Sequence, residues 1–371
     1  MSTLKVAAIK GVSASSDAIT LANDGTCTAN MTNNISNRNL IINGAMQVAQ
    51  RGTSSTSAGI QTVDRFQVNH NGADEAPTQA QVDVTSGTTP YTLGFRKAFK
   101  ITNGNQTSGA ETGDFINYQY IFEAQDIANS GWNYVSSSSN VTLSFWIKSS
   151  VAQNFYGHLQ TVDGTAQNYP FETGSLSADT WTKITKTITG NSNLTFNNDN
   201  GEGLKLFITA FYGTDYTGSV SLNTWAAYAS GTKTPDQTST WYTTNDSTLE
   251  ITGVQLEVGS VATDFEHRSY AQELALCQRY MYRCQDKLIG NAINASDFYN
   301  PRLDHPVPMR ASPSLSNGSF TAHSGNDGSP IISNTRFVGG GGTLSVALHN
   351  GSNNWSTNDW IKFTGDISAE L

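Results

Sequence analysis

The sequence has few charged residues, few cysteines and no long apolar run. Only 14% of its 371 residues are charged, and 21 Lys and Arg are outnumbered by 30 Asp and Glu, giving a formal charge of −9. The basic excess typical of a nucleic-acid-binding surface is therefore missing. No apolar run suits a signal peptide or a membrane-spanning helix, so we expect neither a cleaved leader nor membrane insertion.

Three cysteines are too few for a disulfide framework. Cys277 and Cys284 are seven residues apart, which would place them along one face of the helix expected there rather than in contact. We interpret these two and Cys27 as reduced thiols, which suits assembly in a cytoplasm.

Alternation of apolar and polar residues predicts a mostly β protein. In the 140–150 run, Leu143 and Phe145 share one face, and Ser144 and Trp146 share the other. Turn-rich spacers separate eight such runs, and this pattern predicts a β-sandwich, most simply a jelly roll. The eight runs are 39–46, 64–68, 95–102, 117–124, 140–150, 180–189, 202–213 and 248–259.

A single helix is predicted directly after the last of these strands. The apolar phase of that strand shifts at Thr252 and Gly253, which is typical of a β-bulge. Ser269 and Gln272 then have the spacing of a capping box. The pattern predicts a connector helix over 269–284, packed on the sandwich, on the next domain or on sister helices of an oligomer. Its apolar stripe would be Tyr270, Leu274, Cys277 and Met281.

These elements divide the chain into four parts. Residues 1–38 carry only short alternating pieces, too few for a core of their own. They are either a loose terminus or an extended assembly segment that orders against other copies or a larger structure. Residues 39–268 would form the jelly roll, 269–284 the connector helix and 285–371 a smaller C-terminal β domain, which begins with a proline-rich stretch.

Several stretches resemble one protein family. They are "MSTLKV", "NLIINGAMQVAQRG", "VTLSFWIKSS", "PVPMRASPSLS", the closing "SAEL" and, most specifically, "ITGVQLEVGSVATDFEHRSYAQELALCQRY" at 251–280. Together they resemble virion structural proteins of tailed bacteriophages, especially those infecting marine bacteria and cyanobacteria. The resemblance implies a tail-fibre or other appendage subunit with a jelly-roll core. It also implies a homotrimer, located in the virion after assembly in the host cytoplasm.

A weaker resemblance concerns the "NLIINGAM" stretch alone. It is similar to the opening of carbohydrate-binding-module jelly rolls, which begin with the pattern N-L-x-x-N-G. Met46 stands where an aromatic residue is expected in that pattern. Sugar binding therefore does not follow from this similarity by itself.

The phage resemblance implies a non-enzymatic attachment role. Residues 1–38 would contact other tail or capsid proteins, and a β domain would contact a host-surface glycan. A capsid or tail decoration protein without receptor binding is the alternative. A third hypothesis, a glycan depolymerase, would use paired carboxylates such as Glu123 and Asp126. No GxSxG, HExxH, Walker or CxxC pattern occurs, and we expect no enzyme activity.

Aromatic residues in polar loops are the candidate glycan contacts, because flat rings stack on the C–H faces of sugars. The loop 225–242 is the first choice, since it is long and has no strand pattern. The same rings could instead fill the core or a subunit interface. The candidates are Trp225, Tyr228, Trp241, Tyr242, Trp355 and Trp360.

The stretch "NNDNGEG" at 197–203 has the composition of a calcium loop. Asn197, Asp199 and Glu202 could supply oxygen ligands to a structural Ca²⁺, although the full EF-hand pattern is absent. A hydrophilic turn between two strands is the alternative. The six histidines show no metal-ligand spacing. His267, between strand and helix, is expected to have a structural, hydrogen-bonded role.

Overall fold

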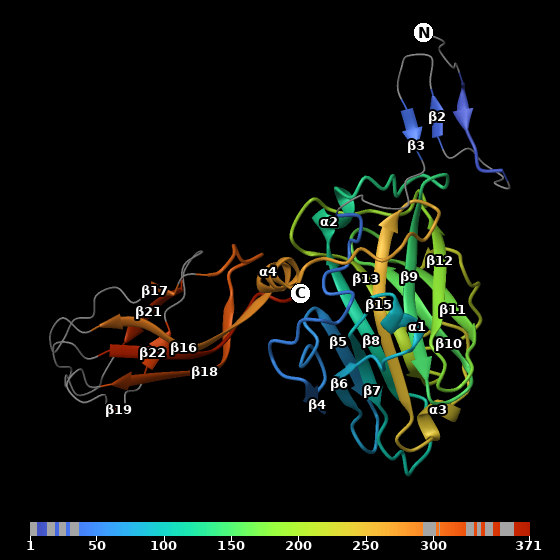
Figure 1. Cartoon of the computed structure of the whole chain (residues 1–371). Coiled ribbons are helices and arrows are strands. Elements are labelled where there is room, and N and C mark those ends of the chain that lie inside the picture. Colours follow the sequence, from blue (N-terminus) through green and yellow to red (C-terminus); the bar gives the residue numbers. More distant parts are fainter. Residues whose placement is uncertain are drawn as a thin grey trace, which may run out of the picture.

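Two antiparallel β-sheets form the body of the protein (Figure 1). The computed structural model describes residues 6–12, 19–21, 27–29, 37–291, 302–303, 305–323, 330–331, 335–337, 344–348 and 360–371. One sheet has the strand order β14-β11-β10-β13-β8-β5, and the other has the order β12-β9-β15-β7-β6-β4. The first comprises β5 (Phe66–Asn71), β8 (Phe115–Glu123), β10 (Asn154–Thr161), β11 (Gln167–Ser175), β13 (Glu202–Tyr212) and β14 (Ala226–Ala227). The second comprises β4 (Ser54–Ser55), β6 (Thr78–Asp83), β7 (Lys97–Thr102), β9 (Asn140–Ser149), β12 (Thr182–Thr189) and β15 (Thr248–Val258).

The jelly-roll β-sandwich predicted from alternation is confirmed. In β9, Leu143, Phe145 and Ile147 are fully buried between the sheets, as the period of two requires. Strands β6, β10 and β11 were not among the predicted runs. The register shift predicted in β15 is also present: pairing with β9 is interrupted between Thr252 and Gln255.

The segment 39–46 is not the strand predicted for it, and residues 42–45 form turns. Asn43 adopts a left-handed φ of 61°, and its side-chain amide donates to the backbone oxygens of Val48 and Asp64, both at 2.9 Å. Asn39 accepts a hydrogen bond from the backbone of β15 at 3.1 Å. Hydrogen bonds to distant residues thus take the place of a strand ladder here.

Helix α4 (Tyr270–Gln278) is shorter than the connector predicted over 269–284. Its N-terminus is the predicted capping box, in which the Ser269 hydroxyl accepts from the backbone N–H of Gln272 at 3.3 Å. The helix ends early because Met281 opens strand β16, which pairs with β22. Residues from Met281 onward, which helical spacing alone predicts to be part of the helix, are therefore paired in a sheet.

The predicted apolar stripe of the helix is only partly correct. Cys277 is buried, but Tyr270 is 55% exposed and Met281 lies in β16. Cys284 is also in β16, so the two cysteines do not share a helical face; both are buried and neither forms a disulfide. The other helices are short: α1 (Thr89–Thr92), α2 (Ala124–Ala128) and α3 (Thr240–Thr243). In the described part of the chain, no helix is long and apolar enough to cross a membrane.

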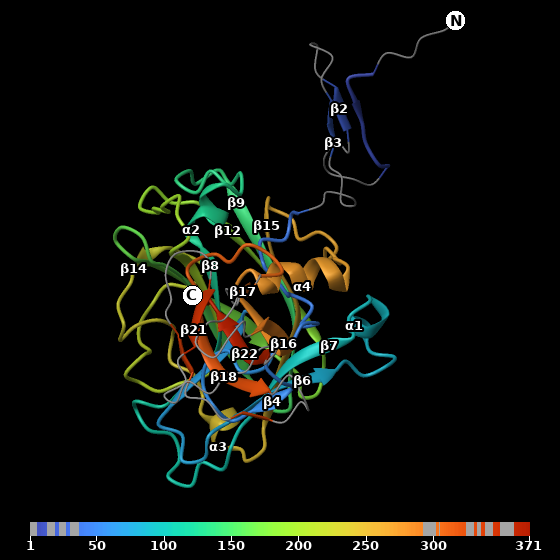
Figure 2. The same ribbon diagram turned by 90° about the vertical axis from the view of Figure 1, so that its left-hand side faces the viewer.

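A smaller group of strands follows α4 and extends beside the sandwich (Figures 1 and 2). One sheet has the order β16-β22-β18-β19 and the other the order β17-β21-β20. Their strands are β16 (Met281–Asn291), β17 (Arg302–Leu303), β18 (Ser314–His323), β19 (Pro330–Ile331), β20 (Thr335–Phe337), β21 (Leu344–Leu348) and β22 (Trp360–Ser368).

A small N-terminal sheet stands apart from the sandwich in both views. It consists of β1 (Ala8–Ile9), β2 (Ile19–Leu21) and β3 (Cys27–Ala29) in that order. The side chains of Val6, Ile9 and Leu21 are 40%, 51% and 39% exposed. So few paired residues cannot form an apolar core without an additional surface to pack on.

Charged side chains hold the base of the C-terminal strands against the sandwich. Arg65, 2% exposed, donates to Glu370 at 2.8 Å. Arg279 donates two hydrogen bonds to buried Glu123, at 3.1 and 2.9 Å. Burial opposes ionisation of Glu123, but Arg279 and the hydrogen bonds from Tyr280 and Gln125 together outweigh it and lower the pKa of this carboxyl. We call this cluster the charged joint: Arg65, Glu123, Arg279, Arg310 and Glu370.

Candidate functional site

A cavity of about 220 Å³ opens on the outer face of the sheet β12-β9-β15-β7-β6-β4. The segments after α1 and after β15 form its walls, and β9, β12 and β15 form its floor. It is lined by Leu93, Phe95, Ser144, Trp146, Lys183, Gly253, Thr263, Asp264, Phe265 and His267.

Trp146 is the largest side chain of the floor. It lies on β9 between the buried residues Phe145 and Ile147, so it points to the opposite, outer face. Strand register places it beside Lys183 of β12 and Thr252 of β15. The indole is half-buried, which leaves part of an aromatic surface open to a ligand.

The aromatic wall is built from three rings. Phe95 lies 4.9 Å from Phe265 and 5.1 Å from His267, and Phe265 lies 4.9 Å from His267, measured between ring centroids. The Nε2 atom of His267 is 2.9 Å from the backbone oxygen of Leu93. This confirms the structural role expected for His267, since the ring joins the segment after β15 to the one after α1.

Gly253 permits the close packing beneath this wall. It has φ of +62° at the β15 bulge, and a Cβ atom there would be 2.6 Å from Cζ of Phe95. A side chain at this position would therefore have to displace the phenyl ring. The glycine that predicts the bulge in the sequence thus also positions an aromatic ring of the cavity.

Some polar groups of the cavity form hydrogen bonds within the chain, and others have no partner among the described residues. Thr263 donates its hydroxyl to Glu257 at 2.6 Å, which ties down the wall segment. Among the described residues, the Lys183 ammonium, the Asp264 carboxylate and the Trp146 indole N–H form no hydrogen bond or ion pair. Open donors and acceptors around a half-exposed ring match the surface of a sugar, which has C–H faces and hydroxyl groups.

Three of the predicted glycan contacts lie in the sandwich core, which contradicts a binding role. Trp225 is 7% exposed, Trp241 is fully buried and Tyr242 is 1% exposed. The two indole N–H groups donate to backbone oxygens, at 2.8 Å to Thr189 and 3.0 Å to Thr248. These rings have too little accessible surface to stack on a sugar, and burial of their large apolar area explains their position.

Two of the remaining predicted contacts, Tyr228 and Trp360, do not line the cavity. Tyr228 is half-buried, and its backbone N–H donates to Ala166 at 2.8 Å. Trp360 is in β22, in register with Asn291 of β16. Trp355 lies outside the described residues. A glycan-binding role for these three residues stays a prediction.

The predicted calcium loop is occupied by internal contacts. The Asn197 side chain donates to Asp163 at 2.7 Å, and Asp199 accepts the N–H of Gly201 at 2.9 Å. Glu202 forms an ion pair with Lys205 at 2.7 Å. Among the described residues, no group of three or more His, Cys, Asp or Glu side chains is placed to hold a metal ion.

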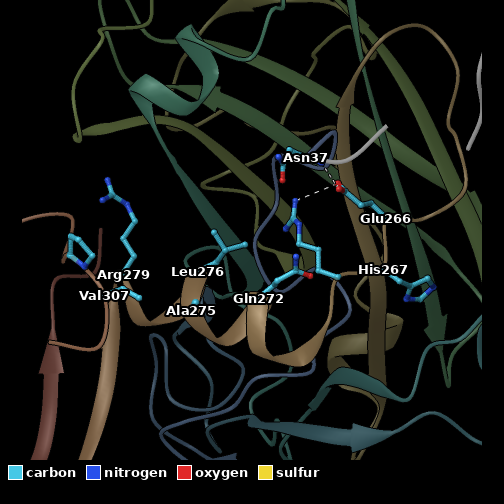
Figure 3. Close-up of a pocket in the computed structure, with 10 residues that line it drawn as sticks. Asn37, Glu266, His267, Gln272, Ala275, Leu276, Arg279 and Val307 are labelled. Atoms are coloured by element: carbon cyan, nitrogen blue, oxygen red, sulfur yellow. Dashed lines mark hydrogen bonds and ion pairs between the residues drawn. The ribbon is translucent and has the colours of Figure 1, made fainter. Parts of the chain in front are cut away.

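A larger groove, of about 580 Å³, runs along α4 (Figure 3). Two of its polar side chains, Glu266 and Arg268, form hydrogen bonds to the backbone of the chain itself. Glu266 accepts the backbone N–H of Asn37 and, at 2.8 Å, that of Asn39, while Arg268 donates to the backbone oxygen of Ile41 at 3.1 Å. These groups therefore anchor the entry to the sandwich.

The chain was compared with known proteins. No protein-family model and no curated protein matches it. Solved structures with a similar arrangement include the enzymatically active domain of tailspike protein 4 of bacteriophage CBA120, with a TM-score of 0.32 and 10% identity over 60% of this chain and 22% of that one. The N-terminal cellulose-binding domain of Cellulomonas fimi β-1,4-glucanase C has a TM-score of 0.27 and 9% identity over 58% of this chain and 99% of its own.

A third similar structure is the family 11 carbohydrate-binding module of Clostridium thermocellum. Its TM-score is 0.26, with 11% identity over 58% of this chain and 98% of that one. At such values the ligands and activities of these proteins do not transfer to this chain. The sandwich assignment rests on the strand pairing described above.

Trp146 and Lys183 were not among the residues predicted to form a site. The signal that could have revealed Trp146 is its position on the polar face of an alternating strand, although the ring there also packs against a small apolar cluster that contains Phe95. Lys183 could be added only from the register of β12 against β9.

Proposed function

We propose that the chain is a non-enzymatic appendage subunit of a tailed-phage virion that binds a glycan through the cavity at Trp146. The observation that carries the binding role is the half-exposed indole beside an open ammonium and an open carboxylate. Such a site supplies stacking and hydrogen bonding together, which is what recognition of a sugar ring requires.

The virion role is supported by the sequence resemblance and by the division of the chain into parts. The N-terminal sheet stands apart and exposes Val6, Ile9 and Leu21, which suits a segment that packs on other virion proteins or on other copies of the chain. We include in the proposal a homotrimer, attachment through residues 1–38 and assembly in the host cytoplasm.

Glycan binding is tested by comparing two tryptophan variants on an array of bacterial surface polysaccharides. Trp146→Ala is expected to lower affinity about thirtyfold, because a central stacking ring contributes about 2 kcal/mol. Trp181→Ala is the matched control, since Trp181 is also half-buried but does not line the cavity. Equal loss in both variants, or binding by neither protein nor variants, would contradict a site at Trp146.

Two further measurements separate the proposal from its alternatives. Incubation with the bound polysaccharide is expected to release no new reducing ends, whereas a depolymerase would release them. A chain lacking residues 1–38 is expected to keep its β-sheet circular dichroism but to lose incorporation into particles. If the protein adsorbs to no susceptible host cell, the decoration role without receptor binding is the better description.

A further inference from the structure

The outer face that carries the cavity is rich in lysine, although the chain has a formal charge of −9. Trp146 and Lys148 point to this face from β9, and Lys183 of β12 is in register with Trp146. One row along the sheet, Lys148 and Lys100 of β7 lie on either side of Glu250 of β15. Two lysines therefore flank a single carboxylate beside the cavity, and a third, Lys183, lies in the neighbouring row opposite Trp146.

Two of the three lysines have no ion-pair partner among the described residues. Glu250 bonds to Lys148 at 3.0 Å, while Lys100 and Lys183 form no ion pair within the described part of the chain. Asp264, on a wall of the cavity, is likewise unpaired among the described residues. Even with Asp264 included, the lysines are in excess. An unpaired ammonium on the floor of a ligand cavity favours a ligand with negative charge.

We propose that the cavity selects an acidic glycan, in which one sugar ring stacks on Trp146 while its carboxylate or sulfate group pairs with Lys183. This inference rests on the proposed glycan-binding function and specifies the class of glycan. Directly opposed residues of neighbouring strands have Cβ atoms roughly 5 Å apart, so one sugar residue spans both side chains.

Asp264 sets the direction of the bound sugar. Its carboxylate repels an acid group but accepts hydrogen bonds from hydroxyl groups. The acid group is therefore directed to Lys183 on the floor of the cavity and the hydroxyl groups to Asp264 on its wall. A neutral sugar lacks this polarity and would lose the contribution of Lys183.

The test uses matched pairs of oligosaccharides that differ only in charge. One pair is an oligogalacturonate and its carboxyl-reduced form; the other is a carrageenan oligosaccharide and its desulfated form. Binding to the full chain is measured by calorimetry at low and high salt. We expect the acidic member of at least one pair to bind more tightly, with an advantage that shrinks as salt screens the charges. A preference within the galacturonate pair indicates recognition of a carboxylate, and one within the carrageenan pair indicates recognition of a sulfate.

Variants of two lysines on β12 test whether the preference for an acidic ligand arises in the cavity. Lys183→Gln is expected to weaken binding of the acidic member by up to about fivefold, the range for a solvent-exposed ion pair, and to leave the neutral member unchanged. Lys183→Arg should retain the preference. Lys186→Gln removes the same charge from the same strand outside the cavity and is expected to change neither affinity.

The outcomes separate this inference from the proposed function. If neutral and acidic members bind equally and Trp146→Ala weakens both, the glycan site stands and charge selection is overturned. If Lys183→Gln and Lys186→Gln weaken acidic binding equally, general surface charge is responsible and selection by the cavity is again overturned. If no member of either pair binds, the acidic-glycan inference is overturned, and the polysaccharide array decides the proposed function separately.

Discussion

The sandwich interior and the charged joint are both buried, but different kinds of side chain fill them. The interior is apolar, with rings such as Phe145 and Phe171 packed 6.4 Å apart between the sheets. In the joint, Arg65 bonds to Glu370 and also lies 3.5 Å from the centre of the Tyr280 ring. The stability of the interior depends on how much apolar surface is buried, whereas that of the joint depends on specific pairs of charged side chains.

This difference indicates separate tasks for the two regions. Apolar packing has little direction, so it stabilises the sandwich without specifying what attaches to it. Charge-assisted hydrogen bonds have defined geometry, and the joint uses them to hold β16 and the last residues of the chain at one place on the sandwich. A buried ion pair adds little stability by itself, but loss of one partner is costly.

The largest effect is expected in the interior. Phe145→Ala removes a fully buried ring and should lower the free energy of unfolding by about 4 kcal/mol. Phe145→Leu, the matched control, should cost about 1.5 kcal/mol because more of the volume is kept. Urea unfolding followed by tryptophan fluorescence measures both. A loss below 1 kcal/mol for the alanine variant would show that the interior is less tightly packed than described.

Removing one partner from the joint is expected to cost somewhat less. Arg65→Met should lower the free energy of unfolding by about 3 kcal/mol, since Glu370 loses its buried partner. Proteolysis near the chain end should become faster than in the parent protein.

A second substitution then distinguishes the two regions. Adding Glu370→Gln to Arg65→Met should recover part of the loss, because it removes a carboxylate that would otherwise keep only its ion pair with Arg51, at 3.2 Å. No recovery would mean that Arg65 acts through packing alone, as a core residue does.

The pH dependence of stability is expected to reveal a buried carboxyl next to the joint. Burial raises the pKa of Asp64 to about 6 from 3.8, against hydrogen bonds from Gln50 that lower it. Between these values the folded protein holds a proton that the unfolded chain releases. The contribution of Asp64 is therefore fully present below pH 3.8 and is lost as pH rises through 6, by at most about 1.4 kcal/mol per pH unit.

Asp64→Asn should remove this dependence, so the difference in free energy of unfolding between the parent protein and the variant should change from pH 4 to 7, as measured by urea unfolding. A difference that stays constant over this interval would contradict a raised pKa. A substitution in the interior is the control, since Phe145→Leu should lower the free energy of unfolding by the same amount at each pH.

The smallest effect is expected at the start of α4. Ser269→Ala removes the side-chain acceptor of the capping box and should cost about 1 kcal/mol. Ser269→Asp retains an acceptor and is the control. Hydrogen exchange of the first-turn amides reports the change locally. Unchanged exchange in the alanine variant would mean that contacts to the sandwich, rather than the cap, hold this turn.

Several features of the fold could be predicted because their causes are local. Alternation in 140–150 identifies β9 and its buried face, Gly253 marks the bulge, and the spacing of Ser269 and Gln272 marks the start of α4. Each of these depends on neighbouring residues, through the period of two, a backbone freedom or a short-range hydrogen bond.

The candidate site was harder to predict because long-range packing decides which rings remain accessible. Trp241 follows a polar residue and Trp146 an apolar one, yet Trp241 is fully buried, whereas Trp146 is half-buried on the outer face of its sheet. Lys183 belongs to the site through strand register alone. Neither burial nor register is a property of a short stretch of sequence.

The sequence by itself therefore determined the β class, the faces of the regular strands and the beginning of α4. Tertiary structure decided where α4 ends, since Met281 pairs with Ser368 in β22 rather than continuing the helix. It also decided that 39–46 forms no strand and that Glu370 bonds to Arg65, 305 residues earlier in the chain. Local choices follow from backbone geometry and the order of apolar residues, whereas these pairings depend on segments that only folding brings together.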